Sequence, residues 1–106
     1  MPSYRVTATI GDLRVGAHPE QVLPAAADAA RERTTVEAWD VAVVRGEARI
    51  TVRFTADDDV AALGIAQHVA VQTNKVAQVT GRKVTRRYGG RWYVVRPGGP
   101  PPSIRG

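Results

Sequence analysis

The sequence predicts a single α+β domain, in which one antiparallel sheet is covered on one face by two helices. Two patterns lead to this prediction. β-branched runs with apolar side chains at every second position occur at residues 4–10 and 48–54, which is typical of half-buried strands. Alanine-rich stretches of strong helix formers follow each of these runs. The 106 residues, 43% of them hydrophobic, suffice for one core and not for two.

A strand and a helix are expected to open the chain. The strand at residues 4–10 has one apolar side, Val6, Ala8 and Ile10, and one polar side, Arg5, Thr7 and Thr9. A helix is expected from Pro19 to Arg33, because proline is tolerated in a first turn and the carboxylate of Glu20 suits the positive end of a helix dipole. Pro24 either kinks this helix or marks the start of its regular part.

A hairpin and a second helix are expected next. Residues 35–44 and 48–54 flank a turn at Arg45–Gly46–Glu47 and should pair antiparallel. In the first of these strands Trp39, Val41 and Val43 share a face; in the second, Ala48, Ile50, Val52 and Phe54 alternate with Arg49, Thr51 and Arg53. Residues 55–58 match a helix start, a hydroxyl followed three positions later by an acid. Apolar spacings of three and four predict that this helix continues to Val79, with Gly81 as its stop.

Two glycines at positions 89 and 90 predict a tight C-terminal hairpin, because the preferred two-residue turns need positive φ angles. This turn places Arg86 opposite Tyr93 on one face and Arg87 opposite Trp92 on the other. Residues 97–106 are dominated by Pro and Gly and are expected to form a flexible tail. The domain is therefore expected to span residues 1–96.

The predicted order of elements is βαββαβ followed by one extra strand. Over residues 4–96 this order resembles the ferredoxin-like α+β sandwich, which has an antiparallel sheet with two helices on one face. The resemblance concerns the order of secondary structure, and it implies a fold without implying an activity.

Charge is distributed very unevenly along the chain. Residues 1–59 hold seven basic and ten acidic residues, a net −3, whereas residues 60–106 hold eight basic residues and no acid. Six of those eight fall between positions 82 and 96, among aromatic residues. This asymmetry suggests a polyanionic partner, and nucleic acid is the first to consider.

Two surfaces are candidates for binding. The first is the C-terminal hairpin, where arginines beside aromatic rings suit phosphates and bases; its candidate residues are Arg82, Lys83, Arg86, Arg87, Arg91, Trp92 and Arg96. The second is the helix-free sheet face, which would carry Arg5, Thr7, Thr9, Arg49, Thr51 and Arg53. The alternatives are a hairpin whose aromatic residues pack on the core and a sheet face that is simply solvated or pairs with a second copy.

No residue pattern indicates catalysis. The chain has no cysteine, its two serines lie at the ends, and neither His18 nor His68 has a second ligand at helical spacing. The three consecutive acids Asp57–Asp59 are explained by a helix N-terminus. We therefore expect no metal and no cofactor, and the sequence favours binding over enzymatic activity.

Three functions remain open from the sequence. The first is a small non-enzymatic binding protein whose basic half engages nucleic acid. The second is a protein-interaction or homo-oligomerisation module that uses the open sheet face, and the third is a cofactor-free enzyme or ligand binder. No apolar run approaches the roughly 20 residues needed to span a bilayer, and the polar N-terminus does not match a signal peptide. A cytoplasmic protein without a membrane partner is expected.

Overall fold

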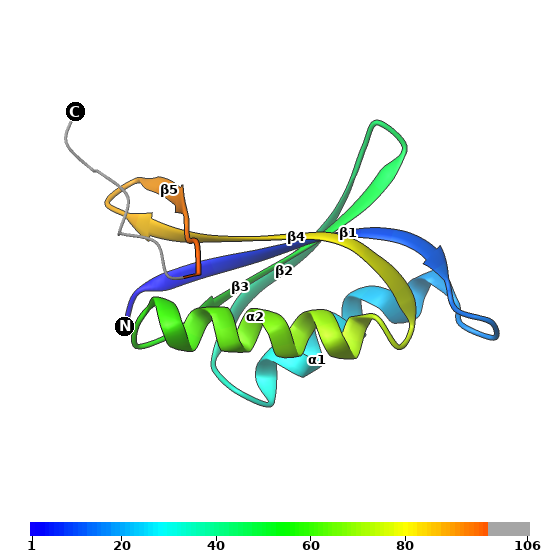
Figure 1. The fold of residues 1–106 in the computed structure, drawn as a ribbon, viewed down its shortest axis with the longest axis horizontal. Helices are drawn as coiled ribbons and strands as arrows, with labels where there is room; N and C mark the ends of the chain where they lie inside the picture. The colour runs from blue at the N-terminus through cyan, green and yellow to red at the C-terminus, as the bar shows by residue number, and fades with distance from the viewer. Residues whose placement is uncertain (98–106) are drawn as a thin grey trace.

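The computed structural model describes residues 1–97, which form a five-stranded antiparallel sheet with two helices on one face (Figure 1). Its elements are β1 (Ser3–Leu13), the 3-10 helix η1 (Pro19–Gln21), α1 (Val22–Arg31), β2 (Val36–Val44), β3 (Glu47–Thr55), α2 (Asp59–Thr73), β4 (Ala77–Tyr88) and β5 (Arg91–Val94). The strand order in the sheet is β2-β3-β1-β4-β5. The predicted α+β class is confirmed. The predicted tail, apart from Pro97, lies outside the described residues.

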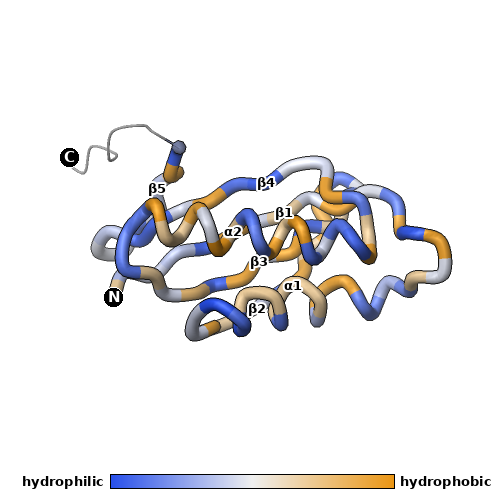
Figure 2. Tube along the Cα trace, turned by 60° about the horizontal axis from the view of Figure 1, so that its bottom comes forward, coloured by the Kyte–Doolittle hydropathy of each residue, from blue (hydrophilic) through white to orange (hydrophobic). Residues whose placement is uncertain are grey.

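The core lies between the sheet and the helices. Apolar and polar positions alternate along the central strands, as the changing colours along β1 and β3 show in Figure 2. The buried side chains of these two strands are Tyr4, Val6, Ala8, Ile10, Ile50, Val52 and Phe54. The helices contribute mostly alanines, among them Ala26, Ala30, Ala62 and Ala66. Small side chains let both helices approach the sheet and each other closely.

Helix α1 has the expected place in the chain but a later start. Pro19–Gln21 forms a 3-10 turn, and the α-helical part begins at Val22. Pro24 is then the third residue of the helix, where a backbone N–H has no intrahelical acceptor. Pro24 therefore lies near the start of the regular helix, which was the second of the two predicted alternatives.

Helix α2 is shorter than predicted. It begins at Asp59, with the carboxylate of Asp58 accepting a hydrogen bond from the Ala61 N–H at 2.8 Å, and it ends at Thr73. The predicted continuation to Val79 is wrong because residues from Ala77 onward pair with β1. Val79 lies opposite Ile10, and Gly81 lies within β4 opposite Thr9 rather than stopping a helix.

The C-terminal hairpin pairs in the predicted register, and β2 and β3 form the predicted antiparallel hairpin. Arg86 lies opposite Tyr93 and Arg87 opposite Trp92 across the Gly89–Gly90 turn. In the first hairpin, Trp39 and Val41 lie opposite the core residues Val52 and Ile50, so they share the helix-side face of the sheet. β2 is the outermost strand, however, and the helices leave most of it exposed. Within residues 1–97, neither helix is both long and apolar enough to cross a membrane.

Candidate nucleic-acid interface

The helix-free face of the sheet gathers the polar side chains that the sequence placed there. Strand register sets them in three rows: Arg53–Arg5–Thr85, Thr51–Thr7–Lys83 and Arg49–Thr9–Gly81. β4 thus adds Lys83 to the predicted set, and Arg87 follows two positions after Thr85 on the same side. We call this surface, together with Trp92, the open face. The threonines keep the middle row polar, and the hydroxyl oxygens of Thr7 and Thr51 are 3.4 Å apart.

Trp92 joins the open face from the far end of the sheet. It lies opposite Arg87 on β5, and its indole reaches back across the sheet. The guanidinium carbon of Arg5 lies 4.0 Å from the centre of the Trp92 ring, and that of Arg53 lies 5.4 Å away. Guanidinium groups are attracted to the electron-rich faces of indoles at such distances. The C-terminal hairpin and the sheet face, two separate candidates in the sequence, therefore form one surface.

The open face is cationic. Its basic residues are Arg5, Arg49, Arg53, Lys83 and Arg87, and the acids on the same side are Glu37, Asp40 and Glu47. Glu37 is already engaged, because its carboxylate accepts a hydrogen bond from Ser3 at 2.7 Å and lies 3.4 Å from Arg53 Nε. In the part of the chain that the structure describes, the buried Nε atoms of Arg49 and Arg53 donate no hydrogen bond. The five basic residues outnumber these three acids, so the face keeps a net positive charge.

A hollow of about 320 Å³ indents this surface beside Arg5 and Arg53. Its walls come from β1, β2 and β3, with Arg5, Ala38, Trp39, Asp40, Thr51 and Arg53 as lining residues. The size lies at the lower end of small-ligand pockets, which start at roughly 300 Å³. Cationic and anionic groups meet in it, so it can accept a flat group with both hydrogen-bond donors and acceptors.

The other candidate residues of the C-terminal hairpin do not lie on the open face. Arg82, Arg86 and Arg91 lie on the helix side of the sheet, since Arg82 pairs with the core residue Ala8 and Arg91 follows the same alternation as Tyr93. Arg96 comes after β5 and lines a groove against α2. Only Lys83, Arg87 and Trp92 of the predicted hairpin set belong to the open face.

Arg86 has a specific partner on the helix side, which the sequence analysis did not find. Its guanidinium lies 2.9 Å from the carboxylate of Asp59, and the buried hydroxyl of Tyr4 donates to the same oxygen at 2.7 Å. The three residues connect the start of α2 to β1 and β4. Arg86 also lies over the ring of Tyr88, 4.7 Å from its centre. This arrangement gives Arg86 a role in holding the hairpin to the domain.

The protonation of this triad follows from burial and pairing. Burial first, and then the hydrogen bond and charge of Asp59, raise the pKa of Tyr4 far above the ordinary 10.0. Burial alone raises the pKa of Asp59, but the hydrogen bonds from Tyr4 and Arg86 outweigh it and bring that pKa below the ordinary 3.8. The hydrogen bond to Asp59 raises the pKa of Arg86. At neutral pH the triad is therefore a neutral phenol, a carboxylate and a guanidinium.

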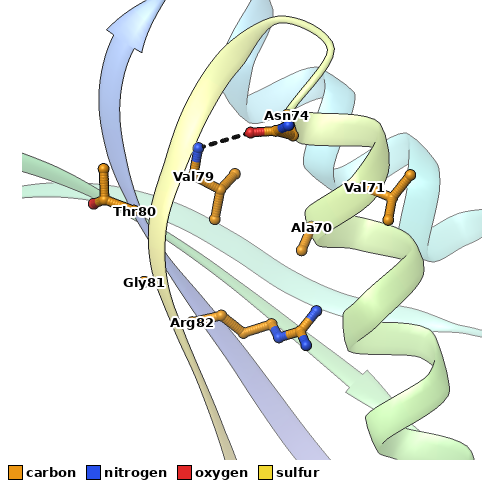
Figure 3. Close-up of a pocket in the computed structure, with 7 residues that line it drawn as sticks. All are labelled: Ala70, Val71, Asn74, Val79, Thr80, Gly81 and Arg82. Atoms are coloured by element: carbon orange, nitrogen blue, oxygen red, sulfur yellow. Dashed lines mark hydrogen bonds between the residues drawn. The ribbon is translucent and has the colours of Figure 1, made fainter.

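A shallow hollow of about 340 Å³ lies on the helix side, between the end of α2 and β4 (Figure 3). The Asn74 side chain accepts hydrogen bonds from the Val79 N–H at 3.1 Å and from Arg14 at 2.9 Å. It thereby fixes the connection from α2 to β4. Arg82 extends from β4 toward the helix at the other end of this hollow (Figure 3). The walls are otherwise mainly small or apolar, so this hollow lacks the charge of the open face.

No arrangement in residues 1–97 points to a metal centre. Over these residues, no group of three or more His, Asp or Glu side chains is placed to hold an ion. His68 lies on α2 with its Nε2 3.5 Å from a Glu32 carboxylate oxygen and its Nδ1 3.4 Å from an Arg33 nitrogen. These neighbours come from the end of α1 and the residues after it, so His68 bridges the two helices.

Comparisons with family models, curated proteins and solved structures found no match to this chain. The function therefore has to be argued from the geometry of the open face.

Proposed function

We propose that this chain is a non-enzymatic binding domain that holds single-stranded nucleic acid across its open face, on a ferredoxin-like sandwich. The order β2-β3-β1-β4 with two helices on one side supports that fold, with β5 as an addition at the edge. The observation that carries the functional proposal is the position of Trp92 over Arg5. It places an aromatic ring among the cations of a surface that the helices leave free.

Each component of the open face has a part in this proposal. The guanidiniums of Arg5, Arg49 and Arg53 bind phosphate oxygens, which they can contact through two parallel hydrogen bonds. Lys83 and Arg87 extend the track of positive charge toward β5. Trp92 provides a stacking surface for a base, and such stacking tolerates any sequence because every base has a π face.

A single strand suits this surface better than a duplex. Bases must be unstacked from each other before they can lie on an indole, and the bases of a duplex are not free to do so. The hollow beside Arg5 then lies within reach of a neighbouring base.

Fluorescence anisotropy tests the proposal. A labelled single-stranded oligonucleotide and a duplex of the same sequence are titrated at about 50 and 200 mM salt. If all five cations contact phosphates, the logarithm of the binding constant should fall with the logarithm of salt with a slope of about −3.5 for the single strand. Absence of binding at low salt would refute the proposal, and preference for the duplex would refute the single-strand assignment.

The competing interpretation, in which the open face pairs with a second copy, makes a different prediction. Self-association through this face would be lost on Thr7→Arg or Thr51→Arg substitution, because either change would place more positive charge at its centre. Nucleic-acid binding would survive these changes or strengthen. The two variants therefore separate the alternatives.

A further inference from the structure

β2 is an outer strand that exposes an apolar row. Trp39, Val41 and Val43 share one side of it, with 48%, 47% and 72% of their surface exposed. Helix α1 contacts this row through Arg31, whose guanidinium lies 4.3 Å from the centre of the Trp39 ring. The turn of the β2–β3 hairpin projects away from the helices (Figure 1). Large contiguous apolar surface on a protein of this size marks an interaction site.

The free edge of β2 lacks two common forms of protection, although the strand has a register shift between Val36 and Ala38. Outer strands are commonly blunted by Lys or Pro, which discourage pairing with another strand. Residues 36–44 contain neither, nor any Arg. The opposite side of the sheet differs, because β5 covers residues 85–88 of β4 and the uncovered part carries Arg82 and Lys83. β2 is therefore the edge that is more open to pairing.

The hairpin register determines which backbone groups of β2 are free. The two-residue turn Arg45–Gly46 makes Val44 and Glu47 the first hydrogen-bonded pair. Residues with even numbers in β2 then bond to β3, and residues with odd numbers direct their N–H and C=O groups outward. The Val41 N–H agrees with this assignment, because it donates to the carboxylate of its neighbour Asp40 at 2.8 Å.

We propose that two copies of this chain pair antiparallel through β2, about a two-fold axis at Val41. In this register the outward groups of Val41 meet those of the second Val41, and Trp39 lies opposite Val43 of the other copy. Pairing about Trp39 would cross the register shift, and pairing about Val43 would leave more of the strand unmatched. Among registers centred on a residue with outward backbone groups, the one at Val41 forms the longest regular ladder, with residues 38–44 aligned in both copies. A register centred on Asp40 would align residues 36–44 but would place two Asp40 carboxylates directly opposite each other.

The charges along β2 support a second copy of this chain as the partner of this strand. Just beyond each end of the ladder, the same register brings Glu37, which also contacts Ser3 and Arg53 of its own chain, toward Arg45 of the other copy. It places Asp40 opposite Ala42. Like charges directly opposite each other disfavour a cross-strand pair. This register places none in that position. The Asp40 carboxylate must release the Val41 N–H, but that N–H then donates to the Val41 carbonyl of the other copy. The apolar rows of both copies become continuous on the helix side.

Pairing through β2 does not depend on nucleic acid. It does affect the surface that is proposed to bind nucleic acid. A two-fold axis through β2 joins two five-stranded sheets into one sheet of ten strands. Both open faces then lie on the same side. A nucleic acid could cross from one copy to the other on a single continuous surface.

Sedimentation equilibrium and light scattering without nucleic acid test the dimer. The unmodified chain should be a concentration-dependent dimer, and Val41→Lys should raise its dissociation constant by about a hundredfold or more, because two ammonium groups would meet at the axis. Val71→Lys is the matched control, since Val71 is similarly exposed, at 51%, but lies on α2. It should leave the dimer unchanged. Circular dichroism and thermal unfolding should show that both variants are folded.

Charge reversal provides a second test that leaves the apolar row intact. Arg45→Glu should weaken the dimer, because it places a carboxylate opposite Glu37 of the other copy, and high salt should reduce this effect. A chain that stays monomeric up to high concentration would overturn the inference, as would a dimer that Val41→Lys does not weaken. Neither result would bear on nucleic-acid binding, which the anisotropy titration measures separately.

Discussion

The guanidinium of Arg5 lies over the indole of Trp92, with 4.0 Å between its central carbon and the centre of the ring. Arg5 stands on β1 in the middle of the sheet, and Trp92 stands on β5 at its edge. The contact brings the C-terminal hairpin onto the open face and makes one surface from two segments that are distant in the sequence.

Replacing Trp92 with alanine should weaken single-strand binding. Loss of one stacked base costs about 1–3 kcal/mol, roughly a factor of ten to a hundred in affinity. The salt slope should change little, because no phosphate contact is removed. Anisotropy titrations at one salt concentration measure the affinity. Tyr93→Ala is the neighbouring control on the helix side of β5, and equal losses in the two variants would argue against stacking on Trp92.

Alkaline pH should destabilise the fold through Tyr4. The pKa of this hydroxyl is raised in the folded chain, so the folded state holds its proton more tightly than the unfolded state does. The stabilisation is complete below the ordinary tyrosine value of 10.0 and is lost as pH rises through the folded pKa. Urea unfolding between neutral pH and pH values above 10.0 should show this decline. Tyr4→Phe should flatten it, and an unaltered pH profile in that variant would contradict the assignment.

At neutral pH the same Tyr4→Phe variant should lose about 1 kcal/mol of unfolding free energy, the usual net value of one hydrogen bond. The aromatic packing is retained, because the ring of residue 4 still lies beside Phe54, with 6.0 Å between ring centres. A urea midpoint shifted by this amount with an unchanged slope would support the hydrogen bond to Asp59. No shift would contradict a stabilising hydrogen bond from this hydroxyl.

Acid should destabilise the fold through Asp59. The pKa of this carboxyl is lowered in the folded chain, so its contribution is present above the ordinary value of 3.8 and is lost as pH falls through the folded pKa. Asp59→Ala should lower the unfolding free energy by about 1–3 kcal/mol at pH 7, because it leaves Tyr4 and Arg86 without their acceptor. Asp57→Ala is the control in the same turn, where the side chain is exposed. An equal effect of the two substitutions would contradict a specific role for Asp59.

Local patterns in the sequence were sufficient for β1, for the hairpin of β2 and β3, and for the register of the C-terminal hairpin. The alternation from Tyr4 to Ile10 identifies a core face without knowledge of its partners, and Gly89–Gly90 fixes which residues of β4 and β5 lie opposite each other. The end of α2 could not be found in this way. Val76 and Val79 continue the helical spacing, and only their proximity to β1 in the folded chain makes this segment a strand.

The contacts among Tyr4, Asp59 and Arg86 depend on distant pairing and were therefore missed. Tyr4 and Asp59 are 55 positions apart, and Asp59 and Arg86 are 27 apart. The exposure of Trp39 likewise depends on how far the helices extend over β2. One signal for Trp92 was available in the sequence. Side chains alternate between the two faces along β4, and pairing β4 with β1 would have placed Lys83, Arg87 and Trp92 on the same side as Arg5.

The most direct test of the open face compares two adjacent basic residues on opposite sides of β4. Lys83 lies on the open face and Arg82 on the helix side, and both are exposed. Replacing either with alanine removes one positive charge, so long-range attraction changes equally. The account predicts that Lys83→Ala reduces the salt slope of single-strand binding by about 0.7 and that Arg82→Ala leaves it unchanged. Equal slopes in the two variants, or a larger change with Arg82→Ala, would contradict it.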